Sequence, residues 1–269
     1  MNDILTQNFF ALLRSGAFAT DETIEPMSAW KWKRLLQLSV MHGLSMWMYD
    51  GVQRCRSQFF LQLPDGLEDE WKKTLNMKYE YSQTQLTNKL LERALDNLIK
   101  EDTNEVSQQP SPTLSFFLIL VDISKHVLNV GIPLALMVEA GLFLRNKGDK
   151  VDYVKLQEWI SRLKIGGMAQ LTADVLVNLL GFSIDEIPFW NEKKRKDFSL
   201  IDKEMFALRP SETNNWYFQQ GKDIFVHTSN SSAMFWQVNH SLRFFRYYPF
   251  ESITNLVTSF ARSLTHIEE

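Results

Sequence analysis

The amino-acid sequence predicts a mainly α-helical protein, a multi-helix bundle, and three observations carry this expectation. Apolar residues recur through most of the chain with the period of a helix that buries one face. Glycine and proline fall between the periodic segments, where helices end and begin. A single stretch, near residues 216–228, alternates weakly around Gly221 and predicts a small β-hairpin.

Residues 1–100 are expected to form an N-terminal helical part. Its opening segment ends at Gly16 and places these apolar side chains on one helical face: Ile4, Leu5, Phe9, Leu12 and Leu13. Ser28 is the predicted N-cap of the next helix. A Pro-Asp-Gly turn at Pro64–Gly66 then opens a long helix, which we expect to run from about Leu67 to about Lys100.

Residues 101–113, "EDTNEVSQQPSPT", are polar and contain two prolines. This composition predicts an exposed linker and an internal boundary of the chain. Residues 114–269 then form a C-terminal helical part, which we expect to pack with the first part as one unit.

In the C-terminal part, the "GIP" sequence at Gly131–Pro133 separates two apolar helices. Glycine suits a helix end and proline suits the first turn of the next helix. The second of the two, residues 134–144, is apolar on every side except Glu139, so it is predicted to be central and buried. Asp152 is the expected cap of the following helix. Two closing helical segments lie in "AMFWQVNHSLRFFRYYP" and "FESITNLVTSFARSLTHI".

Composition excludes several classes of protein. The chain has 269 residues and a net charge of -3, which argues against nucleic-acid binding through a basic surface. The longest apolar run, Val130–Leu144, contains Pro133 and Glu139 and is too short to span a bilayer. The chain has one cysteine, Cys55, and no signal peptide is evident at its start, so we expect a soluble protein of the reducing cytoplasm with an inert thiol.

No motif for a known catalytic or metal site is present. The sequence has no Gly-x-Ser-x-Gly turn, no pair of histidines at zinc-ligand spacing and no phosphate-binding loop. Two-metal phosphoryl or nucleotidyl transfer needs carboxylates held close together. Asp202 and Glu204 form the one Asp-x-Glu pair in an apolar setting, and without a Gly-Ser turn before it a solvated helix start is the simpler interpretation. We therefore assign no catalytic residue and no metal ligand.

Four polar residues remain as candidates for ligand binding. His126 lies on an apolar helix, where a histidine is more often a core residue bonded to a backbone carbonyl than a catalytic group. Glu139 would need a partner if buried, and Lys125, His126 and Arg145 are the candidates. Arg243 and Arg246 share a helix face beside aromatic residues, where they could hold an anion or simply pack.

The stretch "KHVLNVGIPLALMVEAGLFLRNKGDKVDYVKLQEWISRLKIGG", followed by a helix ending in "LLG", resembles the C-terminal half of a bacterial family of uncharacterised nucleotidyltransferases. "FFALLRSG" and the later "HG" and "DGV" resemble that family's helical N-terminal part. Members carry a catalytic core between the two parts, with a Lys-Gly turn and an Asp-x-Asp strand motif. Here residues 101–113 occupy that place, and a core would need on the order of 100 residues.

No residue of this chain matches the metal-binding aspartates of that family. Ala135 stands where the family usually has arginine, and Glu139 stands where it has aspartate, so His126 and Glu139 are the matched polar positions. The resemblance therefore implies a core-deleted relative without a cofactor, which acts as an interaction or regulatory module.

Its expected partner is another protein or a second copy, because loss of the core would uncover apolar surface. One alternative is a transferase that uses Mg²⁺, with a site formed by Asp202, Glu204 and Arg243 or completed by a second chain. Another is a small-molecule-binding protein with a pocket near Glu139.

Overall fold

The computed structural model describes residues 3–59, 61–76, 86–105, 110–129, 131–192, 244–254 and 257–258. Within these ranges the chain is helical and contains no strand, which confirms the predicted fold class. The α-helices are α1 Ile4–Phe18, α2 Ala29–Met41, α3 Ser45–Arg54, α4 Leu67–Thr74, α5 Lys89–Glu105, α6 Pro112–Asn129, α7 Leu134–Lys147, α8 Tyr153–Arg162 and α9 Gly166–Asn178. Three short 3-10 helices accompany them: η1 Cys55–Ser57, η2 Gly148–Lys150 and η3 Ile184–Glu186. The hairpin predicted near residues 216–228 lies outside the described ranges.

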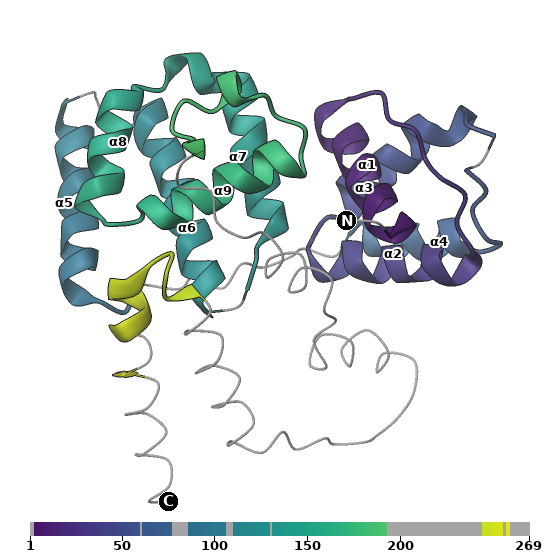
Figure 1. Ribbon diagram of the computed structural model, residues 1–269, viewed down its shortest axis with the longest axis horizontal. Helices are drawn as coiled ribbons and strands as arrows, with labels where there is room; N and C mark the ends of the chain where they lie inside the picture. Colours follow the sequence, from purple (N-terminus) through teal and green to yellow (C-terminus); the bar gives the residue numbers. More distant parts are fainter. Residues whose placement is uncertain are drawn as a thin grey trace, which may run out of the picture.

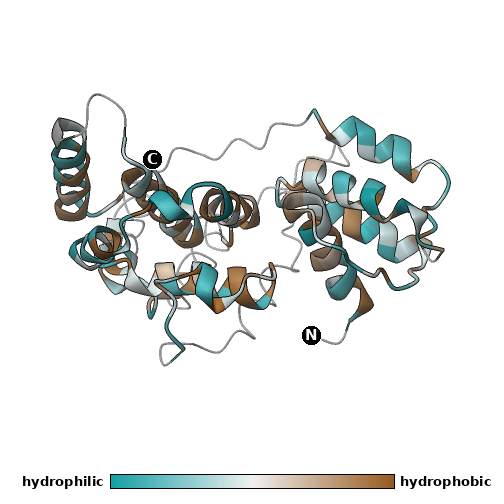
Figure 2. Ribbon diagram, turned by 90° about the horizontal axis from the view of Figure 1, so that it is seen from above, coloured by the Kyte–Doolittle hydropathy of each residue, from teal (hydrophilic) through white to brown (hydrophobic). Residues whose placement is uncertain are grey.

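The helices are arranged in two groups. Figure 1 shows α1–α4 on one side and α5–α9 on the other, and the view from above in Figure 2 separates the same two sets. We call them the first and the second helical group. Among the helices of the described ranges, none is both long enough and apolar enough to cross a membrane.

In the first group, the backbones of α1 and α3 approach each other closely, and glycine makes this possible. A Cβ atom on Gly16 would overlap the Trp47 carbonyl oxygen, and one on Gly51 would overlap the carbonyl oxygen of Leu12. Trp71 of α4 is fully buried, and its indole N–H donates to the Ser45 carbonyl at 3.1 Å. The first group is thus held by close backbone packing around large apolar side chains.

The loop between α1 and α2 is fastened to the first group by two side-chain amides. Asn8 donates to the carbonyl of Glu25 at 2.7 Å and accepts from its N–H at 3.0 Å. Gln58 accepts from the N–H of Ile24 at 3.0 Å and donates to the carbonyl of Glu22. Both amides pair backbone groups that have no helical partner, so the loop has a defined path.

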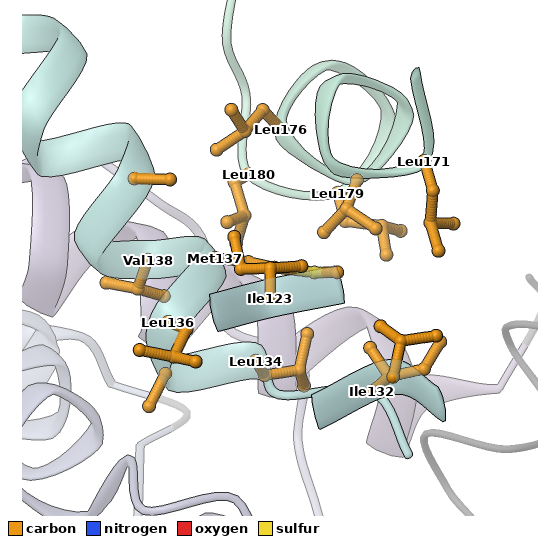
Figure 3. Packing of buried hydrophobic residues seen from close by; sticks show 14 of the residues in the cluster. Ile123, Ile132, Leu134, Leu136, Met137, Val138, Leu171, Leu176, Leu179 and Leu180 are labelled. Carbon is orange, nitrogen blue, oxygen red and sulfur yellow. The ribbon is translucent and has the colours of Figure 1, made fainter. Parts of the chain in front are cut away.

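In the second group, α7 is the central helix that the sequence predicts, because nearly all of its apolar residues are buried. Figure 3 shows its core contacts with α6, α9 and the residues after α9. The side chains that meet there include Ile123, Leu134, Met137, Val138, Leu171, Leu176, Leu179 and Leu180.

The long helix predicted from Leu67 to Lys100 is wrong, because two helices occupy this range. α4 ends at Thr74, and α5 begins at Lys89. Asn88 precedes α5, and its side-chain oxygen accepts from the N–H groups of Leu90 and Leu91 at 3.0 and 3.3 Å. Asparagine bonds local backbone in this way more readily than it occupies a helix interior, so it starts a new helix.

The linker predicted over residues 101–113 is largely helical at both ends. Residues 101–105 complete α5 and residues 112–113 begin α6, while residues 106–109 lie outside the described ranges. Asp102 is fully buried and accepts from the N–H and hydroxyl of Ser111, both at 2.9 Å, and from Lys155 at 3.2 Å. These bonds join α5 to α6 and α8. The predicted N-terminal part therefore ends with a helix that packs in the second group.

Candidate functional site

His126 is a core histidine bonded to the backbone, as the simpler interpretation predicts. Its side chain is buried, and Nδ1 lies 2.9 Å from the carbonyl oxygen of Asp122, one helical turn earlier. Because a carbonyl can only accept, the proton lies on Nδ1. The ring is thus fixed by its own helix.

Glu139 is not buried, so the condition under which it would need a partner is not met. Its side chain is exposed, and within the described part of the chain it forms no hydrogen bond or ion pair. Of its expected partners, Lys125 pairs with Asp122 at 3.4 Å and Arg145 pairs with Glu186 at 3.1 Å. Partial burial, followed by the charge of Asp122, raises the pKa of Glu139. Glu139 occupies the one side of α7 that reaches water, so the helix can be central without burying a charge.

The other predicted residues are divided between described and undescribed parts of the chain. Arg243, Asp202 and Glu204 lie outside the described residues. Arg246 is exposed, with its guanidinium 5.1 Å from the centre of the Tyr247 ring and Nη2 donating to the Tyr247 hydroxyl at 3.3 Å. This geometry agrees with packing of Arg246 against its neighbour.

A different feature, the closing segment at residues 244–254, has a defined position on the second group. The carbonyl of Tyr247 lies where a Cβ on Gly167 would stand, so only glycine fits there. The hydroxyl of Tyr248 donates to the carbonyl of Leu163 at the end of α8, at 3.1 Å. Burial raises the pKa of Tyr248, which keeps this donor protonated. The segment is therefore seated on the turn between α8 and α9.

Glu251 fastens the same segment to the start of α5. It is buried and accepts from the backbone N–H groups of Thr87 and Asn88, the second at 3.1 Å. The side chain of Asn88 also donates to the Thr254 hydroxyl at 3.1 Å. Burial raises the pKa of Glu251 by more than these donors lower it. A carboxylate at a helix N-terminus satisfies free N–H groups and meets the positive end of the helix dipole.

The outer face of this closing helix carries an apolar stripe, which we define as Phe250, Ile253 and Val257. Their side chains are 48, 51 and 61% exposed. Phe250 and Ile253 are three residues apart in the helical residues 249–254, and Val257 lies in the helical residues 257–258. Glu251 lies on the opposite, buried face. The ammonium of Lys164, itself exposed, lies 3.8 Å from the centre of the Phe250 ring. Figure 1 shows the segment in yellow near the start of α5.

The apolar stripe is a candidate binding surface. The described residues contain no group of three His, Cys, Asp or Glu side chains that could hold a metal ion. Cys55 is buried, and burial raises the pKa of its thiol, which keeps it in the unreactive form expected from the sequence. A helix fixed on one face and apolar on the other can bury the exposed face against another helix.

A cavity of about 200 Å³ lies between α8, the start of α9 and Pro188–Asn191. Glu139 does not line it, so the pocket expected near Glu139 is not the one found here. On its polar wall, Gln170 donates to buried Asp174 at 3.0 Å and accepts from the Asn191 N–H at 3.1 Å. The Trp190 indole also donates to Asp174, at 2.8 Å. These bonds tie the chain after α9 back onto that helix.

Sequence reasoning placed two closing helical segments here, which meet between Pro249 and Phe250, and did not separate the two faces of the second. The available signal was the spacing of Phe250, Ile253 and Val257, one position away from Glu251 and Thr254. Spacing alone does not tell which face is buried, because the partners of Glu251, Thr87 and Asn88, lie 164 and 163 residues earlier in the sequence. No protein-family model, curated protein or solved structure matches this chain.

Proposed function

We propose that this protein is a non-catalytic helical interaction module of the cytoplasm that self-associates through the apolar stripe. The observation that carries the proposal is an exposed apolar helix face whose opposite face is fixed by Tyr248 and Glu251. An exposed set of apolar side chains on a rigid element is typical of a binding surface. Because the helix is already fixed on the second group, association would not have to include the entropic cost of ordering it.

We further propose that the chain is a core-deleted relative of the nucleotidyltransferase-like family that its sequence resembles. The place where family members carry the core is here the connection between α5 and α6. Asp102 near the end of α5 bonds Ser111 just before α6, which brings the two helix ends together. The short connection between α5 and α6 supports the proposal that the helical parts remain without the core and serve as an interaction or regulatory module.

A second copy is the occupant that suits the stripe best. Two identical helix faces can pair across a two-fold axis, so each apolar residue meets one from the other copy. Phe250 already has one ring face covered by Lys164, which leaves its edge and the side chains of Ile253 and Val257 for the partner. A pair of this kind resembles the seam between two helices of a bundle.

Sedimentation velocity over a range of protein concentrations tests this proposal. Wild type should shift from monomer to dimer, and the double variant Ile253→Glu, Val257→Glu should remain monomeric. Val154→Glu is the matched control, because Val154 is 84% exposed on α8 and lies outside the stripe. Monomeric wild type at every concentration, or unchanged association of the double variant, would contradict the proposal.

Titration calorimetry with Mg-ATP tests the non-catalytic part separately. We expect no binding in the micromolar range. Binding that Asp202→Ala weakens would instead favour the transferase alternative, with Asp202, Glu204 and Arg243 contributing to a magnesium-dependent site.

A further inference from the structure

The two helical groups meet at a contact built around one arginine from each. Arg14, on α1, donates through Nη1 to the carbonyl of Leu179 after α9, at 2.9 Å. Its other donors, Nε and Nη2, bind both carboxylate oxygens of Glu22 at 2.7 and 2.6 Å. Gly181, with φ of +72°, lies against the Arg14 stem, and a Cβ there would come 3.0 Å from Arg14 Cδ. Arg14 is therefore fitted closely to the second group.

Arg145, on α7, makes the reciprocal contact. Its guanidinium carbon lies 4.9 Å from the ring centre of Phe18 in the first group and 4.2 Å from that of Phe182 in its own group. The two rings meet edge to face, with centres 5.1 Å apart. Glu186 accepts from Arg145 Nε at 3.1 Å. The guanidinium is thus oriented by its own group while it contacts the other.

This contact differs from an ordinary ionic interface, because neither of its two ion pairs crosses between the groups. Arg14 and Glu22 both belong to the first group, and Arg145 and Glu186 both belong to the second. Each arginine would keep its carboxylate if the groups moved apart, so separation would leave no charge without its partner. Among the contacts between described residues, separation would remove the hydrogen bond to the Leu179 carbonyl and the aromatic contacts with Phe18. It would also remove the packing of α1 against α7 and of the Arg14 stem against Gly181.

Each group also has large buried side chains of its own. Trp32 and Trp71 are fully buried in the first group, and Phe116, Phe117 and Trp159 are buried in the second. We infer that Arg14, Arg145, Phe18 and Phe182 form a releasable clasp, which holds the two groups in one arrangement and lets them part without unfolding. The clasp shares no residue with the apolar stripe, so it does not depend on the proposed function.

Distance measurements between two spin labels test the clasp. The labels are placed at Lys73→Cys on α4 and Lys150→Cys on η2, both exposed, in a Cys55→Ser background. The test variant carries Arg14→Met and Arg145→Met. The matched control carries Arg56→Met and Arg162→Met, because these arginines are also paired with carboxylates of their own group, Glu68 and Glu101, away from the clasp.

The test variant should give a longer and broader distance distribution than wild type, with unchanged far-ultraviolet circular dichroism, while the control keeps the wild-type distances. Unchanged distances in the test variant would show that the clasp does not hold the groups together. A loss of helical signal in the test variant, but not in the control, would show that the groups cannot part without unfolding. Either result would overturn the inference, as would a wild-type distribution that is already long and broad.

Discussion

The two helical groups bury different kinds of polar side chain. In the first group the buried polar residues are neutral: Thr6, Asn8, Ser15, Ser39, Ser45 and Thr74. In the second group and its closing segment they include ionisable side chains: Asp102, His126, Asp174 and Glu251. Each of the three carboxylates accepts from another segment: Asp102 from Lys155, Asp174 from Trp190 and Glu251 from Asn88. The first group is thus held mainly by close helix packing, whereas the second also relies on buried carboxylates that connect separate segments.

The largest expected loss of stability comes from adding a side-chain atom where the backbones of α1 and α3 meet in the first group. Alanine is favoured over glycine in a helix by about 1 kcal/mol, so Gly51→Ala would stabilise α3 if space allowed. The added Cβ would instead overlap the Leu12 carbonyl, and we expect a net loss of about 3 kcal/mol. Urea denaturation measures the free energy of unfolding.

Gly166→Ala, in α9, is the control for this change. A Cβ there would be 3.8 Å from the nearest atom, on Ile160, which is ordinary contact. We expect Gly166→Ala to be neutral or slightly stabilising. Equal effects of the two substitutions would show that close α1–α3 packing does not set the stability of the first group.

The next effect concerns a buried carboxylate of the second group. Asp102→Ala would remove the acceptor of the Ser111 N–H and the ion pair that Asp102 forms with Lys155. Because the Lys155 side chain is 31% exposed and can reach water, we expect a loss of about 2 kcal/mol, below the full cost of breaking a buried pair. Asp96→Ala on the exposed side of α5 should change stability by less than about 0.5 kcal/mol. Similar unfolding energies for both variants would contradict the role given to Asp102.

Acid should act in opposite directions on two buried or half-buried carboxylates, Glu22 of the first group and Glu251 of the closing segment. For Glu22, burial raises the pKa, but the hydrogen bond and charge of Arg14 lower it by more, so its pKa lies below the usual range. Stability from Glu22 is therefore present above the unfolded pKa and is lost as the pH falls through the folded pKa. For Glu251 the pKa is raised, so ionisation disfavours the folded state, and this cost disappears as the pH falls.

Thermal unfolding between roughly pH 6 and pH 3 checks this difference, since carboxyl groups titrate in that range. The stability advantage of wild type over Glu22→Gln, on the order of 1 kcal/mol at neutral pH, should shrink as the pH falls. An advantage that stays constant with pH would mean that the Arg14–Glu22 pair does not set the pKa of Glu22.

Local sequence pattern predicted the helices better than it predicted what joins them. The central position of α7 follows from apolar spacing, which is a property of the segment alone. The same spacing in α1 predicted the burial of Leu5, Phe9, Leu12 and Leu13, whereas Ile4 is exposed. The linker was misplaced because the burial of Asp102 depends on Lys155 in another helix. The cap that Glu251 provides for α5 was missed for the same reason, since its partner Thr87 lies 164 residues earlier in the sequence. Because Asp102 lies among polar residues in the sequence, we expected it to be solvated. The hydrogen-bond donors of both carboxylates come from other parts of the chain and are brought to them only by the tertiary fold.

The smallest expected effect is the coupling between His126 and Glu139, which the sequence suggested as a buried pair. His126→Ala removes a buried ring and its bond to the Asp122 carbonyl, so it should cost about 1–2 kcal/mol. Glu139→Gln should change stability by less than about 0.5 kcal/mol at neutral pH, because the side chain is exposed. Its sign should be stabilising, since the raised pKa of Glu139 means that ionisation disfavours the folded state.

The double variant completes the cycle and measures the coupling directly. We expect the two effects to add, because His126 donates to its own helix while Glu139 faces water. The benefit of Glu139→Gln should also fade as the pH is lowered and the wild-type carboxyl becomes protonated. Glu139→Leu serves as the control for exposure, because a leucine on a solvent-facing position gains little from burial. A coupling above about 0.5 kcal/mol would show that His126 and Glu139 act on each other after all, and that the water-facing side of α7 has been misplaced.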